Sequence, residues 1–194
     1  MIPPVATNLF ELVGNTPLVE VENIFAKLET YNPSGSIKDR MVSYMIQKAI
    51  RSNKLKTNSK IIEATTGNTG ISLAMFSANL NFKFTAVMPE HMSKQRKQIM
   101  RQFGANLVQT PKEEDIMGAI NKYGELIKTH SDAWRPMQFE NKHNFEAHEF
   151  GLGKELVSQL PTIDAFVAGF GTGGTLIGVA KALKKHSCRW IFIY

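Results

Sequence analysis

The sequence has 194 residues, of which 43% are hydrophobic and 21% are charged, and its formal net charge is +6. These values are ordinary for a soluble globular protein of one domain or two small ones. The single cysteine, Cys188, excludes a disulfide framework and a cysteine-rich metal site, so we predict no metal centre. The sequence has no signal-peptide pattern and no apolar run of membrane-spanning length, which predicts a cytoplasmic protein without membrane contact.

The positive charge does not predict nucleic-acid binding. The basic residues are spread along the chain, with small groups at 94–101 and 181–185. Both groups lie on predicted amphipathic helices, where a solvated face explains them. A ligand that carries phosphate is a simpler reason for part of the charge.

Strands and helices alternate along the chain. Two short strands are expected within 17–29, followed by a helix to about Ser52. The further predicted strands are 60–64, 84–88, 105–109, 165–170 and a last one from Trp190, and the predicted helices are 71–80, 93–103, 112–129, 145–160 and 176–186. This order predicts an α/β fold with mostly parallel sheets.

A lysine stands at the start of the first predicted helix. The stretch before it, Asn-Pro-Ser-Gly-Ser, predicts a turn, and Ser36 is a candidate N-cap. Lys38 then falls in the first helical turn, where the positive end of the helix dipole lowers the pKa of an amine. A lysine that loses its proton easily can form a Schiff base with a carbonyl. For this lysine taken alone, a solvated surface position is the commoner interpretation.

A glycine-rich turn, 171–175, lies between a predicted strand and a predicted helix. Glycines let the backbone approach a ligand, the free N–H groups of a helix start bind anions, and two threonines add hydroxyl donors. Gly169, Gly171 and Gly174 also fit the dinucleotide pattern, but no Asp or Glu follows Asp164 to hold a ribose. No P-loop lysine follows the glycines either. We therefore predict a phosphate-binding turn, with a ligand-free turn as the alternative.

A second strand-to-helix turn, 65–70, is rich in hydroxyl and amide groups. Its backbone donors could bind a carboxylate, and the amide of Asn68 could hold a phenolate or carbonyl oxygen. For this segment taken alone, a plain N-cap and turn is the commoner interpretation. Such turns gather at the carboxyl ends of parallel strands. An amine, a phosphate site and a phenolate partner are together what pyridoxal phosphate needs.

With these turns the chain resembles the cysteine synthase family of pyridoxal-phosphate enzymes, which also includes cystathionine β-synthase. Four motifs match in order: GNTPL, NPSGSIKDR, TTGNTG and GTGGT. The resemblance implies the fold of the tryptophan synthase β-subunit, which has two three-layer α/β domains with mostly parallel sheets. It places a smaller domain at 36–146 and an incomplete larger domain, which binds the cofactor phosphate, at 1–35 plus 147–194.

The resemblance also implies a role for each matched residue. Lys38 would hold the cofactor as an internal aldimine and then move the α-proton, and Asn68 would bond the cofactor's 3′-oxygen. The residues implied for the cofactor phosphate are Gly171, Thr172, Gly173, Gly174 and Thr175. The residues implied for the substrate carboxylate are Thr65, Thr66, Gly67, Thr69 and Gln138. The implied reaction replaces the acetate of O-acetylserine with sulfide, through an aminoacrylate, to give cysteine.

The sequence departs from the family pattern in several places. Thr66 stands where a serine is usual, the segment around 21–25 is short, and Asn-Lys-His-Asn at 141–144 replaces the usual Asn-Pro-x-Asn. Family members run on beyond this point and supply a serine for the pyridine nitrogen, so we expect a truncated chain. The alternatives are a non-catalytic remnant that binds the cofactor weakly or a protein partner, and a cystathionine β-synthase. The resemblance also implies a homodimer, with serine acetyltransferase as a candidate partner.

Overall fold

Residues 5–185 are described by a computed structural model, in which the chain divides into two units. Unit 1 consists of Met1–Met45 and Gln138–Tyr194, and unit 2 consists of Ile46–Met137. The helix α1 (Lys38–Arg51) begins in unit 1 and ends in unit 2. The domain limits implied by the family resemblance, 36–146 for the smaller domain, stay a prediction.

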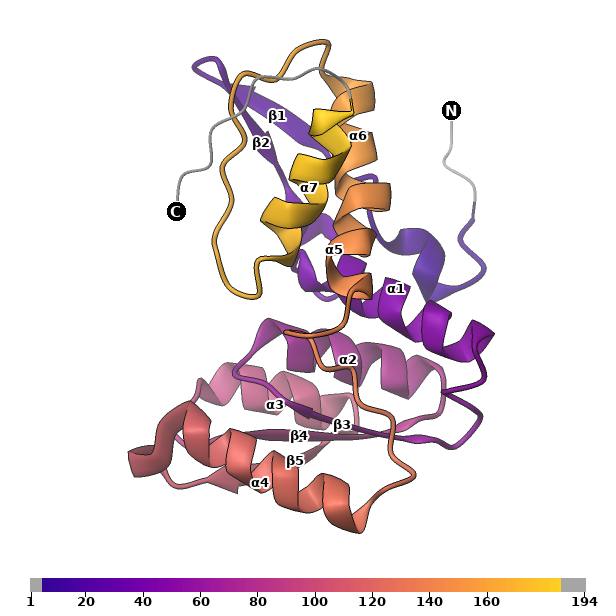
Figure 1. The fold of residues 1–194 in the computed structure, drawn as a ribbon, viewed down its shortest axis with the longest axis vertical. Coiled ribbons are helices and arrows are strands. Elements are labelled where there is room, and N and C mark those ends of the chain that lie inside the picture. The colour runs from indigo at the N-terminus through magenta and orange to yellow at the C-terminus, as the bar shows by residue number, and fades with distance from the viewer. Residues whose placement is uncertain (1–4, 186–194) are drawn as a thin grey trace. The chain divides into compact units, whose positions relative to one another are not determined.

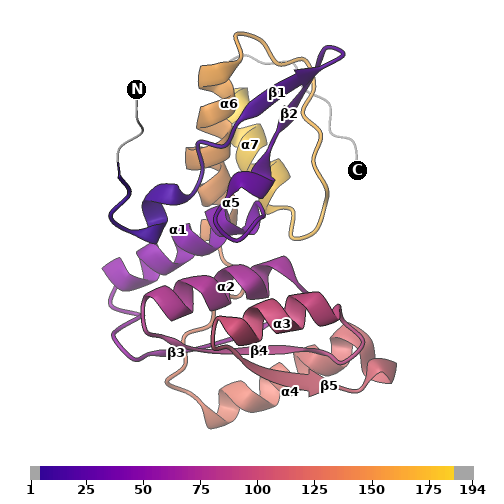
Figure 2. The ribbon, with the colours of Figure 1, turned by 180° about the vertical axis from the view of Figure 1, so that it is seen from behind.

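Unit 2 is built on a parallel sheet of three strands in the order β3-β4-β5. The strands are β3 (Lys60–Ala64), β4 (Lys83–Pro89) and β5 (Asn106–Thr110). The helices α2 (Asn68–Asn79) and α3 (Lys94–Gln102) cover one face, and α4 (Asp115–Thr129) covers the other (Figures 1 and 2). Because both faces are covered, the central strand β4 is largely buried and mostly apolar, as parallel strands usually are.

The segment that leaves α4 extends this sheet along the outer edge of β3. The backbone N–H of Trp134 donates to Lys60 O at 2.8 Å, and Ile62 N–H donates back to Trp134 O at 3.2 Å. The buried carboxylate of Glu63 accepts the N–H of Met137 at 3.0 Å. These bonds give the edge of β3 a partner, so its backbone groups are not left unsatisfied.

The N-terminal part of unit 1 contains a small antiparallel hairpin. Its strands are β1 (Leu18–Val21) and β2 (Ile24–Lys27), with Leu18 opposite Lys27. The two turn residues, Glu22 and Asn23, both have positive φ, as a two-residue hairpin of type I′ requires. The short helices η1 (Leu9–Leu12) and η2 (Glu29–Tyr31) lie on either side of this hairpin in the chain.

The rest of unit 1 is helical. The helix α5 (His143–Ala147) continues through a π-helical turn, η4 (His148–Leu152), into α6 (Gly153–Gln159), and α7 (Gly174–Lys184) packs along this column (Figure 1). The approach is close enough to require glycine, because a Cβ on Gly178 would lie 2.2 Å from the backbone oxygen of Phe145. The buried cluster between these helices consists of Leu152, Leu156, Val179 and Leu183.

The structure confirms the α/β class and the parallel sheet. The strand predicted at 60–64 has the same limits in the structure, and the helix predicted from Ile71 begins earlier, at Asn68. The helix predicted at 112–129 begins as a separate short helix, η3 (Lys112–Glu114). None of the helices in the described residues is long and apolar enough to cross a membrane.

The prediction of a strand at 165–170 is wrong, because this segment forms neither a strand nor a helix. A strand exists only where a neighbouring strand supplies a hydrogen-bond ladder, and in the described part of unit 1 the only two strands pair with each other. The apolar side chains of Val167 and Phe170 are accordingly exposed. The strand predicted from Trp190 lies outside the described residues.

Candidate functional site

The predicted turn before α1 forms as a set of local hydrogen bonds. Gly35, which has a φ of +84°, donates its N–H to Asn32 O at 2.8 Å. The hydroxyl of Ser36 accepts the N–H of Lys38 at 3.3 Å, so this side chain caps the first helical N–H, although Ile37 and not Ser36 directly precedes α1. The buried carboxylate of Asp39 accepts both the hydroxyl and the N–H of Ser34. These bonds hold the first turn of α1, where Lys38 is the first residue.

The amine of Lys38 has a lowered pKa because the residue is partly buried and the charged form loses solvation. The direction agrees with the sequence prediction, although burial is the cause in the structure and the prediction rested on the helix dipole. Within the described part of unit 1 no carboxylate pairs with this amine. The amine at the start of α1 therefore loses its proton more easily than an exposed lysine does.

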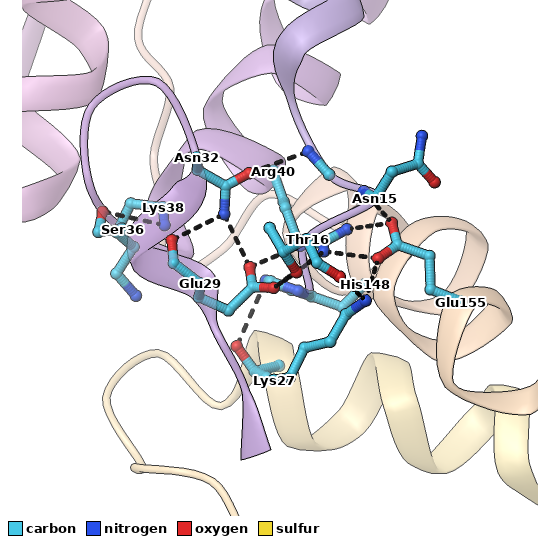
Figure 3. Close-up of polar contacts among 12 residues, drawn as sticks. Asn15, Thr16, Lys27, Glu29, Asn32, Ser36, Lys38, Arg40, His148 and Glu155 are labelled. Carbon is cyan, nitrogen blue, oxygen red and sulfur yellow. Dashed lines mark hydrogen bonds and ion pairs between the residues drawn. The ribbon is translucent and has the colours of Figure 1, made fainter. Parts of the chain in front are cut away.

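A buried network of charges lies beside the turn at 32–38, called the lysine turn below (Figure 3). The guanidinium of Arg40 bonds Glu29 at 2.6 Å and Glu155 at 2.6 and 2.8 Å. Lys27 pairs at 2.8 Å with Glu155 Oε2, which also accepts from Arg40, and the hydroxyl of Thr16 donates to Glu29 at 2.7 Å. The network therefore joins the start of α1 to η2, to the hairpin and to α6.

Two members of this network, Arg40 and Glu155, hold each other ionised. Burial alone would raise the pKa of Glu155, but its hydrogen bonds to Arg40, Lys27 and the N–H of Asn15 lower it to about 2. Burial would likewise lower the pKa of Arg40, but Glu155 and Glu29 raise it above its usual value. Glu155 and the guanidinium of Arg40 therefore stay charged at neutral pH, and the geometry of their hydrogen bonds fixes the backbone near Lys38.

The network also explains the GNTPL motif, for which sequence reasoning gave no structural role. Gly14 donates its N–H to the side chain of Asn32 at 2.9 Å, and Asn15 donates to Glu155 at 3.0 Å. A Cβ on Gly14 would lie 2.9 Å from Glu155 Oε1 and 3.0 Å from Arg40 Nη1, and its φ is +85°. The motif thus anchors the lysine turn to α6 in a space that only glycine fits.

The glycine turn 171–175 leads into α7, as predicted. Gly173 has a φ of +77° and precedes the first helical residue, Gly174. A Cβ on Gly174 would lie 2.0 Å from Asn144 Oδ1, so this position has room only for glycine. Thr172 and Thr175 are half-buried on either side of these glycines. The turn presents the free N–H groups of a helix start together with two hydroxyls, which is an arrangement that binds anions.

His148 is a buried residue that the sequence analysis did not assign to the site. Its pKa is lowered to about 3 by burial and by the positive charges of Arg40 and Lys38, so the ring is neutral at physiological pH. Its Nε2 lies 3.4 Å from the hydroxyl of Thr175, in the glycine turn. His148 begins the π-helical turn η4, and such turns often occur at functional sites. The helix predicted at 145–160 is therefore interrupted by a π-helical turn that its apolar spacing did not predict.

In unit 2 the turn 65–70 follows the carboxyl end of β3. The hydroxyl of Thr65 accepts the N–H groups of Gly67 at 3.3 Å and Gly70 at 3.1 Å, so this side chain shapes the turn. Thr65 and Thr69 are buried, whereas Thr66 and Asn68 are exposed. Asn68 is the first residue of α2, so the backbone N–H groups after it belong to a helix start.

Arg96 adds a positive charge to this turn. Its Nη1 lies 3.5 Å from the backbone oxygen of Thr66, and a Cβ on Gly67 would lie 2.6 Å from the same nitrogen. The sequence interpretation treated the basic group at 94–101 only as a solvated helix face. The structure instead places one of its members over the turn that was predicted to bind a carboxylate.

The sequence-predicted site residues therefore occupy both units. Lys38, Gln138 and the turn 171–175 belong to unit 1, whereas the turn 65–70 with Asn68 belongs to unit 2. Gln138 is buried, and its backbone oxygen accepts a bond from Asn144 at 2.8 Å. Among residues 5–185 no group of three or more His, Cys, Asp or Glu side chains could hold a metal ion.

Comparisons with known proteins identify a matching family and similar sequences. Residues 9–193 match a family described as "Pyridoxal-phosphate dependent enzyme". A cysteine synthase of Staphylococcus aureus is 46% identical over 189 residues, which cover 92% of this chain and 61% of the relative. The chain thus spans less than two thirds of the length of this curated relative.

Solved structures of similar sequence share the fold. The O-acetylserine dependent cystathionine β-synthase from Helicobacter pylori has a TM-score of 0.90 at 38% identity, over 98% of this chain and 66% of that one. A hydrogen sulfide-producing enzyme from Fusobacterium nucleatum has a TM-score of 0.91 at 37% identity, over 97% of this chain and 66% of that one.

Proposed function

We propose that this chain, which belongs to the family of pyridoxal-phosphate dependent enzymes, acts as a cysteine synthase. The reaction would replace the acetate of O-acetylserine with sulfide to give cysteine. The 46% identity to the cysteine synthase of Staphylococcus aureus supports this activity. The observation that carries the proposal is the position of Lys38, a partly buried amine of lowered pKa at the start of α1.

The residues of unit 1 fit the cofactor. Pyridoxal phosphate needs an amine for its aldehyde and an anion site for its phosphate. Lys38 supplies the amine, and the turn 171–175 supplies N–H groups and hydroxyls around Gly174, where a Cβ would collide with Asn144. When bound, the cofactor withdraws electrons from the bonds of the substrate's α-carbon.

In this proposal Lys38 acts twice. Its Nζ would hold the cofactor through the aldehyde, and the same nitrogen would serve as the base for the proton on the α-carbon of the substrate. A general base works best when its pKa lies near the working pH, and burial lowers the pKa of Lys38 in that direction. The charge network around Arg40 holds the backbone on which this amine is mounted.

The remaining roles come from the two turns and from Gln138. We assign the cofactor phosphate to Gly171, Thr172, Gly173, Gly174 and Thr175. We assign the substrate carboxylate to Thr65, Thr66, Gly67, Thr69 and Gln138, and the cofactor's 3′-oxygen to the amide of Asn68. The exposed hydroxyl of Thr66 and amide of Asn68 support the assignment to the turn in unit 2, as does the adjacent charge of Arg96.

A cystathionine β-synthase is the second candidate. The similarity to the O-acetylserine dependent enzyme from Helicobacter pylori favours it. The two reactions differ in the sulfur nucleophile, so sulfide and homocysteine supplied with O-acetylserine would distinguish them by product. The predicted cytoplasmic location, homodimer and serine acetyltransferase partner stay predictions.

The test is an absorbance titration of the purified chain with pyridoxal phosphate, followed by O-acetylserine and then sulfide. We expect a visible band in the wild type and in Lys54→Ala, which changes an exposed lysine, and no such band in Lys38→Ala. Cysteine should form only where the band forms. A wild type without a band would overturn the proposal. A band that does not respond to O-acetylserine, with no acetate released, would support instead a remnant that binds the cofactor without turnover.

A further inference from the structure

One buried side chain links the two groups of unit 1 that are assigned to different ligands. Asn144, in α5, is 5% exposed. Its Nδ2 lies 2.8 Å from the backbone oxygen of Gln138 and 2.7 Å from the hydroxyl oxygen of Thr172. Gln138 is assigned to the substrate carboxylate and Thr172 to the cofactor phosphate, yet Asn144 itself has no role in either assignment.

The orientation of this amide follows from its partners. A backbone carbonyl can only accept a hydrogen bond, so the atom of Asn144 that faces Gln138 O must be the NH₂ group. The same nitrogen faces Thr172 Oγ1. Because an NH₂ group is purely a donor, the hydroxyl oxygen of Thr172 must accept from it.

This fixes the direction of the Thr172 hydroxyl. Its oxygen accepts the N–H of Gly174 at 3.4 Å as well as the amide of Asn144. A hydroxyl has two acceptor positions and one proton, so both acceptor positions are engaged and the proton is left to donate. In the described part of unit 1 that proton has no acceptor. It belongs to a turn where the free N–H groups of α7 favour an anion.

The other end of the amide supports a role beyond packing. Among the described residues the Oδ1 atom of Asn144 is buried without a hydrogen-bond partner. An unmet buried acceptor destabilises the fold, and an apolar side chain of the same size would avoid this loss. The NH₂ group of Asn144 gives a reason to keep an amide here. By donating to Thr172 Oγ1, it leaves the hydroxyl proton of Thr172 free to donate to a ligand.

We infer that Asn144 is a positioning residue that sets the Thr172 hydroxyl as a hydrogen-bond donor to phosphate and ties the phosphate turn to the backbone of Gln138. The inference rests on the proposed function, since the phosphate in question is that of the cofactor. Asn144 acts through Thr172 and does not touch the phosphate. Loss of its donor should therefore weaken phosphate recognition and spare the reaction of Lys38 with an aldehyde.

The experiment compares pyridoxal phosphate with pyridoxal, which has the same aldehyde but no phosphate. Dissociation constants for both are measured on the cofactor-free chain as wild type, Asn144→Leu and Asn144→Asp. Asn144→Leu removes the donor while keeping a side chain of similar size. Asn144→Asp also removes the donor and, in addition, introduces a negative charge. Because a hydrogen bond to a charged group is worth about 1.5–3 kcal/mol, we expect roughly 10- to 100-fold weaker pyridoxal phosphate binding in Asn144→Leu and more in Asn144→Asp. Pyridoxal binding should change less than about twofold, below 0.5 kcal/mol.

Two further variants serve as controls. Asn141→Asp adds the same charge three residues earlier, but the Oδ1 of Asn141 accepts the N–H of His143 at 3.1 Å, which a carboxylate also does. This variant should bind pyridoxal phosphate nearly as the wild type does. Thr172→Val removes the hydroxyl itself, so adding Asn144→Leu to it should weaken binding by much less than Asn144→Leu does alone.

Each result has a defined meaning. Unchanged pyridoxal phosphate affinity in Asn144→Leu and Asn144→Asp would overturn the inference and leave the proposed function intact. Equal weakening for both ligands, or additive effects of Asn144→Leu and Thr172→Val, would reduce Asn144 to a purely structural residue and so also overturn it. A wild type that does not prefer pyridoxal phosphate to pyridoxal would refute the proposed phosphate site, and the inference with it.

Discussion

The two units stabilise their interiors by different means. Unit 2 is a sheet of consecutive strand–helix segments whose core residues, such as Ile62, Val87 and Ala119, are apolar. Unit 1 has an apolar cluster as well, but its N-terminal turns are held by Arg40, which bonds a carboxylate 115 positions away in the sequence. Apolar packing fills volume without direction, whereas hydrogen-bonded charges fix orientation. The directional contacts thus lie next to Lys38, the residue to which the proposed function assigns the cofactor.

The largest expected effect comes from removing the centre of the charge network. Arg40→Met would leave Glu29 and Glu155 largely buried without their guanidinium partner. We expect a loss of about 3–5 kcal/mol in the free energy of unfolding, the usual result of breaking a buried ion pair from one side. Urea denaturation followed by circular dichroism measures it.

The matched control is an exposed ion pair in unit 2. The side chains of Lys60 and Asp132 lie 3.6 Å apart and are 44% and 69% exposed. Lys60→Met should cost about 0–1 kcal/mol, as for other surface pairs. A loss in Arg40→Met no larger than that in Lys60→Met would show that the network does not stabilise unit 1.

A smaller effect should depend on pH. The pKa of His148 is about 3 in the folded chain, against an ordinary 6.5. The unfolded chain therefore binds one more proton between these values, so the contribution of His148 is complete above pH 6.5 and is lost as the pH falls toward 3. Between pH 7 and pH 5 the loss should reach about 2 kcal/mol, since one pKa unit is worth 1.36 kcal/mol.

The variant His148→Asn should lack this loss. The measurement is the difference in unfolding free energy between wild type and variant at pH 7, 6 and 5, a range that lies above the ordinary pKa of Glu155. Other titrating groups cancel in the difference. Parallel curves for the two proteins would contradict the neutral, buried state of His148.

The smallest expected effect tests the apolar core of unit 2. Ile62 is 3% exposed, and Ile62→Val should cost about 0.5–1.5 kcal/mol. The same change at Ile24, which is 71% exposed in the hairpin of unit 1, should stay within about 0.5 kcal/mol. Equal losses at both positions, measured by urea denaturation, would remove the distinction between a packed core and a surface strand.

The sequence predicted those parts of the fold that depend on local patterns. The strand 60–64 and the helices around it follow from apolar spacing and from turn residues, and the start of α1 at Lys38 follows from Ser36 and the turn before it. The segment 165–170 has the same apolar pattern as a strand but forms none. Its pattern could not show whether a partner strand would lie beside it, because pairing is a property of the fold and not of the segment.

The candidate site was predictable where its residues are neighbours in sequence. The turns 65–70 and 171–175 could each be recognised from their own composition. The bonds of Arg40 to Glu155 and of Asn144 to Thr172 join residues 115 and 28 positions apart, and no periodicity or motif connects them. The buried state of His148 depends likewise on the packing of α7 against α5, which sequence spacing does not reveal.

The π-helical turn η4 sets the phase of the helix that follows it. A π turn contains one residue more than an α-helical turn, so α6 continues with its side chains rotated relative to α5. A chain one residue shorter here would continue as a regular α-helix, and every side chain of α6 would turn by about 100° around its axis. Glu155 would then face away from Arg40. The extra residue thus lets α5 direct Asn144 toward the glycine turn while α6 directs Glu155 toward Arg40.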